Sequence, residues 1–313
     1  MKLLSTISLC LLVAVHCFSQ TRTIPRQQIP VVGTRASLIP PDHFTVSSEF
    51  PGFVQESTNA SILVTEFPAP FSAASSGFSN PTMFSQRGMM LLEKQQVRVS
   101  GQAGILARVM QKISGTDYLK WLLVLGDERQ SLLITASFPK ELERQLSEKM
   151  KASLLSAIWN TEKVIVLTEG LNYSITEKGE LRIAKRIANS LVYTKNGVFP
   201  SKDVDDPVFV IAQSLAKTDI ANPEEFAEGR VLQTAEVTDV EIESSKTSTI
   251  DTLNGYEIVA TAKDKQSGLP MSIYQVILFE EQRYFLMQGL VSRKNRQPFL
   301  KVFEEMTKTF RRK

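Results

Sequence analysis

The feature that most constrains the fold of this chain is an internal duplication. The motif Asn-Pro-x-x-Phe occurs at residues 80–84 and again at residues 222–226. Each copy is typical of a helix start, because asparagine caps the first turn and proline is favoured at the first helical position. In the second copy Glu225 completes an arrangement like a capping box. We therefore predict matching helices over 81–93 and 223–234.

The duplication continues through a hairpin in each half. Residues 121–134 and 274–287 both read as an aromatic-led apolar strand, an acidic turn and a second apolar strand. The turn that opens the preceding strand is expected at Ser100-Gly101 in the first copy and at Asn254-Gly255 in the second, since glycine tolerates the positive φ of such turns. Between the first helix and this turn the second copy has about a dozen extra residues, around 239–251, which could form a longer hairpin or a binding loop.

An amphipathic helix closes each copy. Its apolar residues recur three to four positions apart, which places them on one helical face that can cover a sheet. These residues are Leu142, Leu146, Met150, Leu154 and Ile158 in the first copy and Phe299, Phe303, Met306 and Phe310 in the second.

The order of apolar segments predicts an α+β fold. Consecutive strands joined by short turns favour an antiparallel sheet with helices packed on it. The expected fold class is two tandem domains, each an antiparallel β-sheet flanked by helices in an α/β/α sandwich. We place a signal peptide at 1–19, an N-terminal linker at 20–32, the first domain at 33–159 and the second at 162–313. Strands are expected near 34–39, 53–56, 60–66, 94–99, 104–113, 118–126 and 130–138, and then near 171–176, 180–184, 190–194, 207–215, 236–243, 255–264, 271–279 and 283–292.

The first residues are typical of an exported protein. Lys2 precedes an almost wholly apolar run from Leu3 to Val15, which is followed by the small residue Ser19. This is the layout of a secretory signal peptide, and the run is too short to span a membrane. We expect cleavage after Ser19 and a secreted or periplasmic location. Lipid attachment through Cys17 is the weaker alternative, because His16 stands where a small residue is usual. No later segment has the length and apolar character of a transmembrane helix.

Composition argues against several kinds of site. Both cysteines, Cys10 and Cys17, lie in the predicted signal, so the processed chain would have neither a disulfide nor a thiolate, and His43 would be its one histidine. We therefore expect no metal and no cofactor. The 36 basic and 33 acidic residues are interspersed, whereas nucleic-acid binding requires a clustered basic face. We expect no nucleic-acid partner, and the sequence does not determine the oligomeric state.

The strand order resembles the PsbP-like fold. The residues that carry the resemblance are Gly33 to Phe44, Phe53, Ala60 to Pro70 and, in the second copy, Asp206 to Gln213. That superfamily includes the lumenal extrinsic protein of photosystem II and a nuclear-import factor that binds a small GTPase. The first half is also similar to exported bacterial proteins with this fold. The resemblance implies a role in binding other proteins and supplies no catalytic signature.

Two segments are candidate partner-binding surfaces. Phe67 and Phe71 lie among prolines in a segment that we interpret, together with the residues up to Gly77, as an exposed loop. The two aromatic side chains could anchor a partner there or fold back on the core. The extra residues of the second copy contain the other candidates, which are Glu241, Glu243 and Asp251.

No residue pattern identifies a catalytic centre. His43 follows a proline-rich turn, and no Gly-x-Ser-x-Gly motif accompanies it. The acidic pairs Asp127-Glu128 and Glu280-Glu281 occupy equivalent turns, where turn formation and solubility explain them. The segment Asp203 to Asp206 lacks the glycine and the distal glutamate of a calcium loop.

The sequence therefore favours an exported, non-catalytic binding, scaffold or assembly protein of the cell envelope. Its partner would be a protein or a small ligand. The alternative is an envelope hydrolase with an unfamiliar active site, and a pocket with convergent polar groups would favour that alternative.

Overall fold

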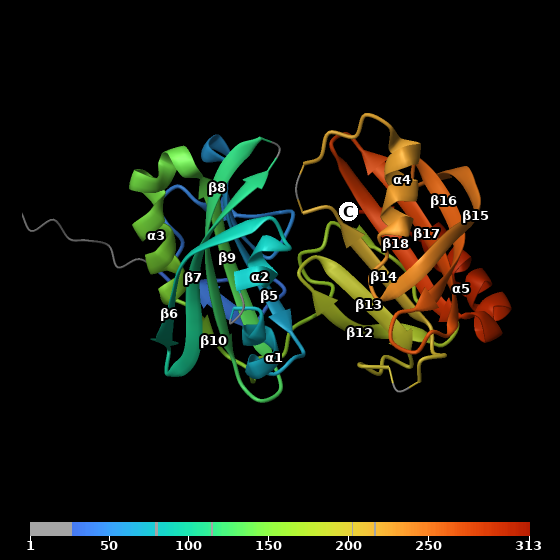
Figure 1. The fold of residues 1–313 in the computed structure, drawn as a ribbon, viewed down its shortest axis with the longest axis horizontal. Coiled ribbons are helices and arrows are strands. Elements are labelled where there is room, and N and C mark those ends of the chain that lie inside the picture. Colours follow the sequence, from blue (N-terminus) through green and yellow to red (C-terminus); the bar gives the residue numbers. More distant parts are fainter. Residues whose placement is uncertain (1–26, 79–80, 114, 202, 216) are drawn as a thin grey trace, which may run out of the picture.

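Two seven-stranded antiparallel sheets dominate the computed structural model (Figure 1), which describes residues 27–313 except 79, 80, 114, 202 and 216. The first sheet has the order β3-β4-β5-β9-β8-β7-β6, and the second has the order β12-β13-β14-β18-β17-β16-β15. The two orders correspond strand by strand. The predicted signal peptide, the first part of the predicted linker and Asn80 lie outside the described residues.

The strands of the first sheet are β3 (Thr45–Val46), β4 (Gly52–Gln55), β5 (Ala60–Phe67), β6 (Met89–Val99), β7 (Gln102–Ile113), β8 (Thr116–Gly126) and β9 (Ser131–Pro139). Those of the second sheet are β12 (Leu181–Ile187), β13 (Ser190–Lys195), β14 (Val208–Gln213), β15 (Val237–Ile250), β16 (Leu253–Asp264), β17 (Pro270–Glu280) and β18 (Arg283–Ser292). Two small sheets pair β1 (Ile29–Pro30) and β10 (Ile158–Trp159) with β2 (Ala36–Leu38), and β11 (Tyr173–Ser174) with β19 (Arg311–Arg312).

Within the described residues, five α-helices accompany the sheets. They are α1 (Phe71–Ser76), α2 (Pro81–Ser85), α3 (Glu143–Leu155), α4 (Pro223–Leu232) and α5 (Arg296–Lys308). Short 3₁₀ turns lie at η1 (Glu56–Thr58), η2 (Lys140–Leu142) and η3 (Arg293–Asn295).

The duplication extends to the spacing of the elements. Helices α3 and α5 lie 153 residues apart at both ends, from Glu143 to Arg296 and from Leu155 to Lys308. The same shift relates β10 to β19, which both follow the closing helix and pair with a short strand. Two copies of one α/β unit therefore make up the described chain.

Each sheet is covered by helices on both faces, so each copy is an α/β/α sandwich. In the first copy Leu146, Met150 and Leu154 of α3 join the larger core on one face. On the other face Phe78 and Phe84, from the segment of α1 and α2, pack on β7 and β8. In the second copy α5 covers one face and α4 the other. The expected fold class is thus confirmed.

The packing of each closing helix on its sheet includes a helix residue and a strand residue that change together between the two copies. Ala136 faces Trp121 in the β8–β9 register, and Gly289 faces Tyr274 at the equivalent place in β17–β18. A β-carbon on Gly289 would overlap the ring of Phe303, a residue whose counterpart on α3 is Met150. The larger helix residue is therefore accommodated by the smaller strand residue.

Several sequence expectations need correction. The helix predicted over 81–93 ends at Ser85, because the following residues pair with β7 as strand β6. The second-copy turn lies at Asp251 and Thr252 rather than at Asn254-Gly255, and Gly255 pairs with Leu278 as Gly104 pairs with Leu125. Most of the extra residues near 239–251 belong to the long strand β15, so the hairpin alternative holds rather than the loop.

Candidate functional site

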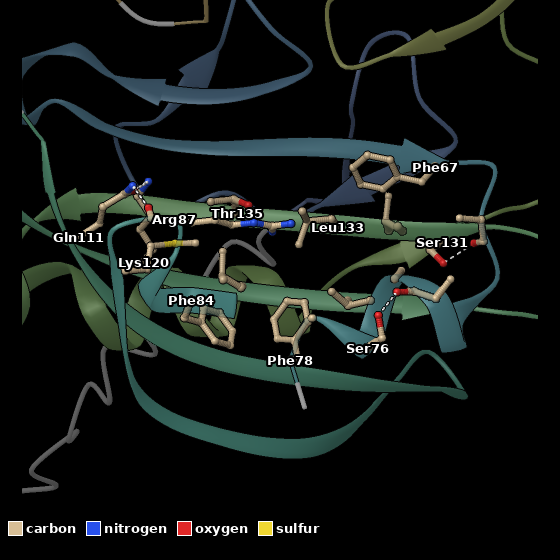
Figure 2. Close-up of a pocket in the computed structure, with 18 residues that line it drawn as sticks. Phe67, Ser76, Phe78, Phe84, Arg87, Gln111, Lys120, Ser131, Leu133 and Thr135 are labelled. Atoms are coloured by element: carbon tan, nitrogen blue, oxygen red, sulfur yellow. Dashed lines mark hydrogen bonds between the residues drawn. The ribbon is translucent and has the colours of Figure 1, made fainter. Parts of the chain in front are cut away.

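A cleft lies between the first sheet and the segment of α1 and α2. Its volume is about 660 Å³, within the range typical of small-molecule sites. Strands β5, β7, β8 and β9 form its floor, and Figure 2 shows the lining side chains. The cleft belongs to the first copy alone and draws on no residue beyond Thr135.

The segment of α1 and α2, which forms the roof of the cleft, is fixed by hydrogen bonds to the β8–β9 hairpin and by a contact between two of its own rings. The backbone N–H of Phe71, at the start of α1, donates to the carbonyl of Asp127 at 2.8 Å. Ser131 Oγ donates to the carbonyl of Ala69 at 2.6 Å. The rings of Phe78 and Phe84 meet edge to face, with centroids 5.6 Å apart. These contacts hold the helical segment above the strands while leaving space beneath it.

The walls of the cleft are mainly apolar. Alternate residues of β8 and β9 face it, as expected where side chains of a strand point to opposite faces. The apolar lining consists of Phe67, Ala69, Ala73, Ala74, Phe78, Phe84, Met89, Leu122, Val124, Leu132 and Leu133.

One end of the cleft is cationic. Figure 2 shows Arg87, Gln111 and Lys120 together at this end, with Ser76 and Ser131 at the other. Lys120 Nζ donates to Gln111 Oε1 at 2.5 Å, and Gln111 Nε2 donates to the carbonyl of Arg87 at 3.2 Å. Burial lowers the pKa of Lys120 from its ordinary value.

Neither cation of the cleft is neutralised. Among the residues that the structure describes, no carboxylate lies within ion-pair distance of Lys120 or of Arg87. A partly buried ammonium group without a counter-ion is unfavourable, and an anion placed next to it would relieve that cost. The cleft therefore combines a long apolar wall with an unpaired positive end.

The second copy closes the middle of the corresponding face. The positions equivalent to Leu122 and Thr135 carry Gln275 and Gln288. Gln275 Nε2 donates to the carbonyl of Ala227 in α4 at 2.8 Å. Gln288 Nε2 donates to Gln275 Oε1 at 3.0 Å and to Thr234 Oγ1 at 3.0 Å. A more polar cavity of about 400 Å³ remains beside α4.

Of the two predicted aromatic candidates of the first copy, Phe67 lines this cleft and Phe71 does not. Phe67 is the last residue of β5 and lines the cleft, half-buried. Phe71 begins α1 and packs against the apolar cluster around Phe84. The expected exposed loop is thus the end of a strand followed by a helix. Pro70 is extended at the N-cap of α1, and the first N–H of that helix, from Phe71, donates to the carbonyl of Asp127 in the β8–β9 turn. A role of either ring in binding a partner stays a prediction.

The acidic candidates of the second copy do not approach the cleft. Glu243 on β15 forms a two-point ion pair with Arg296, and hydrogen bonding from that guanidinium lowers the pKa of Glu243. Asp251 accepts from the backbone N–H of Arg312 at 2.9 Å and from its Nε at 3.2 Å. Glu241 is exposed on β15. Two of the three carboxylates are thus engaged within the chain.

Other titratable residues also have structural surroundings. His43 is exposed at a turn with a φ of 69°. Asp127 accepts from the backbone N–H groups of Arg129 and Gln130 and so forms the β8–β9 turn, and these bonds lower its pKa. Asp205 and Asp206 approach Lys294 and Lys195. No group of three or more His, Cys, Asp or Glu side chains suited to a metal occurs in the described part of the chain.

Sequence reasoning missed the cationic end of the cleft. Lys120 looks like an ordinary polar residue of a half-exposed strand. The signal that could have found it is its position two residues before Leu122 and four before Val124, on a strand face that is otherwise apolar. Among the helices of the described residues, none has the length and hydropathy needed to cross a membrane.

Comparisons with known proteins complete the description. No protein-family model matches the chain, and no curated protein matches it. One similar solved structure is LpqN of Mycobacterium tuberculosis, described as involved in cell envelope biogenesis, at 12% identity and a TM-score of 0.33, covering 44% of this chain and 81% of that one.

Two further structures span different shares of the chain. The PsbP protein of Synechocystis (CyanoP) has 11% identity and a TM-score of 0.30 over 43% of this chain and 92% of its own. The immunity protein TplEi of Pseudomonas aeruginosa has 11% identity and a TM-score of 0.30 over 91% of this chain and 96% of its own. A PsbP structure is thus among those to which the chain is similar, but these values carry no inference about function.

Proposed function

We propose that this chain is a non-catalytic binding protein of the cell envelope and that the cleft of its first copy takes a single-chain amphiphile with an anionic head. The observation that carries the proposal is Lys120, which has no carboxylate partner among the described residues, at the end of an apolar cleft of about 660 Å³. The placement in the envelope rests on the predicted signal peptide. Recovery of the chain from its native host with Lys2 still present would contradict that placement.

The shape of the lining favours an elongated apolar tail. A tail that lies along Leu122, Val124 and Leu133 would be removed from water on both sides, by the strands beneath and by α1 above. Each buried methylene contributes about 0.8 kcal/mol of transfer free energy. Chain length should therefore control affinity.

The cations favour an acidic head. A carboxylate at the Lys120 end would accept a charge-assisted hydrogen bond from Nζ, and Arg87 would add a second positive group. A neutral head would leave Lys120 unpaired, and a cationic head would be repelled by it. Head-group charge is thus the second determinant of affinity.

The test is calorimetric titration of the full chain with dodecanoate, octanoate and the neutral dodecanol. We expect dodecanoate to bind at one site and octanoate to bind at least about tenfold more weakly, because it buries fewer methylenes. Lys120→Gln should weaken dodecanoate binding about tenfold, by about 1.4 kcal/mol, and leave dodecanol unchanged.

A pair of variants in α1 shows whether the amphiphile occupies this cleft. Ala74 lines it, whereas Ser72 is an exposed residue of the same helix that does not. Ala74→Phe should abolish binding of dodecanoate, and Ser72→Phe should retain it. Equal binding by both variants would contradict the proposal, and turnover of an acyl ester by the unaltered chain would support the hydrolase alternative instead.

A further inference from the structure

A second cavity lies where the two copies meet. Its volume is about 240 Å³, and it shares no lining residue with the cleft. The first copy contributes Gly33 to Arg35 and Glu66, the connecting segment contributes Lys163, and β12 contributes Lys185 and Arg186. The interface is held nearby by an ion pair between Arg283 and Glu49 and by a hydrogen bond from Asn189 Nδ2 to the carbonyl of Glu49 at 3.2 Å.

Positive charge predominates in this interdomain cavity. Its lining includes the four cations Arg35, Lys163, Lys185 and Arg186 and the single carboxylate of Glu66. Glu66 is fully engaged by the first copy. It accepts from Arg35 Nη2 at 2.6 Å, from Arg35 Nε at 2.8 Å and from Trp159 Nε1 at 3.2 Å. Arg35 is therefore neutralised, whereas the other three cations have no ion pair among the residues that the structure describes.

Arg186 is buried and has no ion-pair partner among the described residues. Its side chain donates to three backbone carbonyls, those of Leu167, Glu169 and Ala188, and all three are neutral acceptors. The residue is 6% exposed. Nε and Nη1 make these hydrogen bonds, and the more distant Tyr173 hydroxyl and Glu169 carboxylate favour the charged form of the side chain.

Lys185, the neighbouring residue, also lacks a carboxylate within ion-pair distance among the described residues. Its ammonium group lies 5.9 Å from the ring centre of Phe199. Burial, together with repulsion from Arg35, lowers the pKa of Lys185 to about 8, despite attraction from Glu66. Two adjacent cations in a partly buried cavity are costly unless an anion accompanies them.

We propose that the interdomain cavity binds the phosphate group of a small ligand, with Lys185 as its direct cationic contact and Lys163 at the entrance. A dianionic phosphate would balance the charges of Lys185 and Arg186, neither of which has a carboxylate within ion-pair distance among the described residues. The volume suits a small phosphate rather than an extended molecule. Because the lining comes from both copies, the bound phosphate would also hold them together.

The experiment is a titration of the full chain with inorganic phosphate against chloride at equal ionic strength. Methyl phosphate in a parallel titration distinguishes free phosphate from a phosphomonoester head. We expect saturable binding of at least one of the two, weakened at least tenfold in Lys185→Gln. Lys265→Gln is the matched control, because it removes the same charge from an exposed lysine outside the cavity.

A spectroscopic measurement separates direct contact from a general charge effect. Nuclear magnetic resonance of the reductively methylated lysines should show the pKa of Lys185 rising when phosphate is added, while the other lysines change little. The proposal is overturned if phosphate binds no better than chloride, or if the two glutamine variants bind it equally. Binding of dodecanoate should be the same in Lys185→Gln as in the unaltered chain, so failure here leaves the function proposed for the cleft intact.

Discussion

Two lysines illustrate how a single side chain can mark a site on an otherwise ordinary sheet. Lys120 and Lys185 both lie on strands, are both partly buried, and have a pKa lowered chiefly by that burial. Lys246 and Lys308 show the opposite shift. Each forms an ion pair at the surface, and its partner, Glu257 or Glu304, raises its pKa. A cation without a carboxylate partner is thus the residue-scale signature of both proposed sites.

The pKa of Lys185 gives a pH-dependent contribution to stability. Its folded-state pKa of about 8 lies below the ordinary value of 10.5, so between these values the unfolded chain binds more protons than the folded chain. The contribution is therefore unfavourable below pH 8 and is relieved as the pH rises from 8 to 10.5. The groups that face this lysine are Arg35, Glu66, Lys163 and Arg186.

We expect Lys185→Gln to be more stable than the unaltered chain at pH 7 in phosphate-free buffer, by about 1 kcal/mol after allowance for solvent screening. That advantage should shrink when the pH is raised to 10. Urea denaturation at both pH values measures it, with Lys265→Gln as the control for a change in net charge. An advantage that is the same at pH 7 and pH 10 would show that Lys185 is not destabilised by its surroundings.

At the scale of elements, each closing helix is matched to its own sheet by complementary volumes. Trp121 donates to Ser147 on α3 at 3.1 Å, and Tyr274 meets Thr307 on α5 at 3.2 Å. Gly289 makes room for Phe303, which stacks on Phe209 with centroids 5.6 Å apart. Close packing of this kind makes the helix and the strand interdependent.

Gly289→Ala tests that interdependence, because the added methyl group meets the ring of Phe303. We expect it to lower the free energy of unfolding by about 1–3 kcal/mol, as over-packing of a core does. Adding Phe303→Met, which reproduces the pair found in the first copy, should restore part of the loss. A double-mutant cycle measured by urea denaturation gives the coupling, and strictly additive effects of the two substitutions would refute it.

The elements also show how far sequence reasoning reaches. The hairpins of β8–β9 and β17–β18 and the central part of each closing helix were predicted correctly, because long periodic apolar patterns report burial directly. The expected ends of these helices were wrong: Leu142 and Phe310 lie just outside α3 and α5, and Ile158 is an exposed residue of strand β10, since the chain pairs with β2 there. Helix α1 was missed, since a short Ser- and Ala-rich segment after Pro70 has no such pattern. The end of α2 was misplaced, because pairing with β7 overrides local helical preference after Ser85.

The candidate site was predicted only in fragments. Phe67 was identified from its proline-rich neighbourhood and lies in the cleft. The cleft itself arises from two tertiary differences between the copies. The helices that cover the equivalent face differ, and the strand residue beneath them is Leu122 in the first copy and Gln275 in the second. Those differences depend on contacts between segments far apart in the chain, which a local pattern does not encode.

At the scale of the whole molecule, the two copies meet through few but specific contacts. Gly33 has a φ of 73°, and a β-carbon there would overlap the guanidinium of Arg186. The first copy thus approaches a buried cation of the second copy at a position where only a hydrogen fits. The predicted domain limits of 33–159 and 162–313 stay a prediction, and a substitution at this junction can test whether the two copies unfold as separate units.

Gly33→Ala should separate the unfolding of the two copies. Gly268→Ala is the matched control, because Gly268 has a φ of 72° and a β-carbon there meets open space. Both substitutions incur about 1–2 kcal/mol of backbone strain, and only Gly33→Ala also disturbs the junction. Scanning calorimetry should show a broadened or split transition for Gly33→Ala, whereas matching profiles for the two variants would rule out a sensitive junction.

The difference between the open cleft and its closed counterpart also affects how the two copies can evolve. On the second sheet, a change at Gln275 or Gln288 removes hydrogen bonds to α4, so selection for stability restrains it. In the first copy, Thr135 on β9 and Ala74 on α1 both line the cleft, so a change in side-chain size there alters the space within it. If the cleft binds the proposed amphiphile, we expect substitutions on the first copy to change ligand preference at a smaller cost in stability than substitutions at the equivalent positions of the second copy.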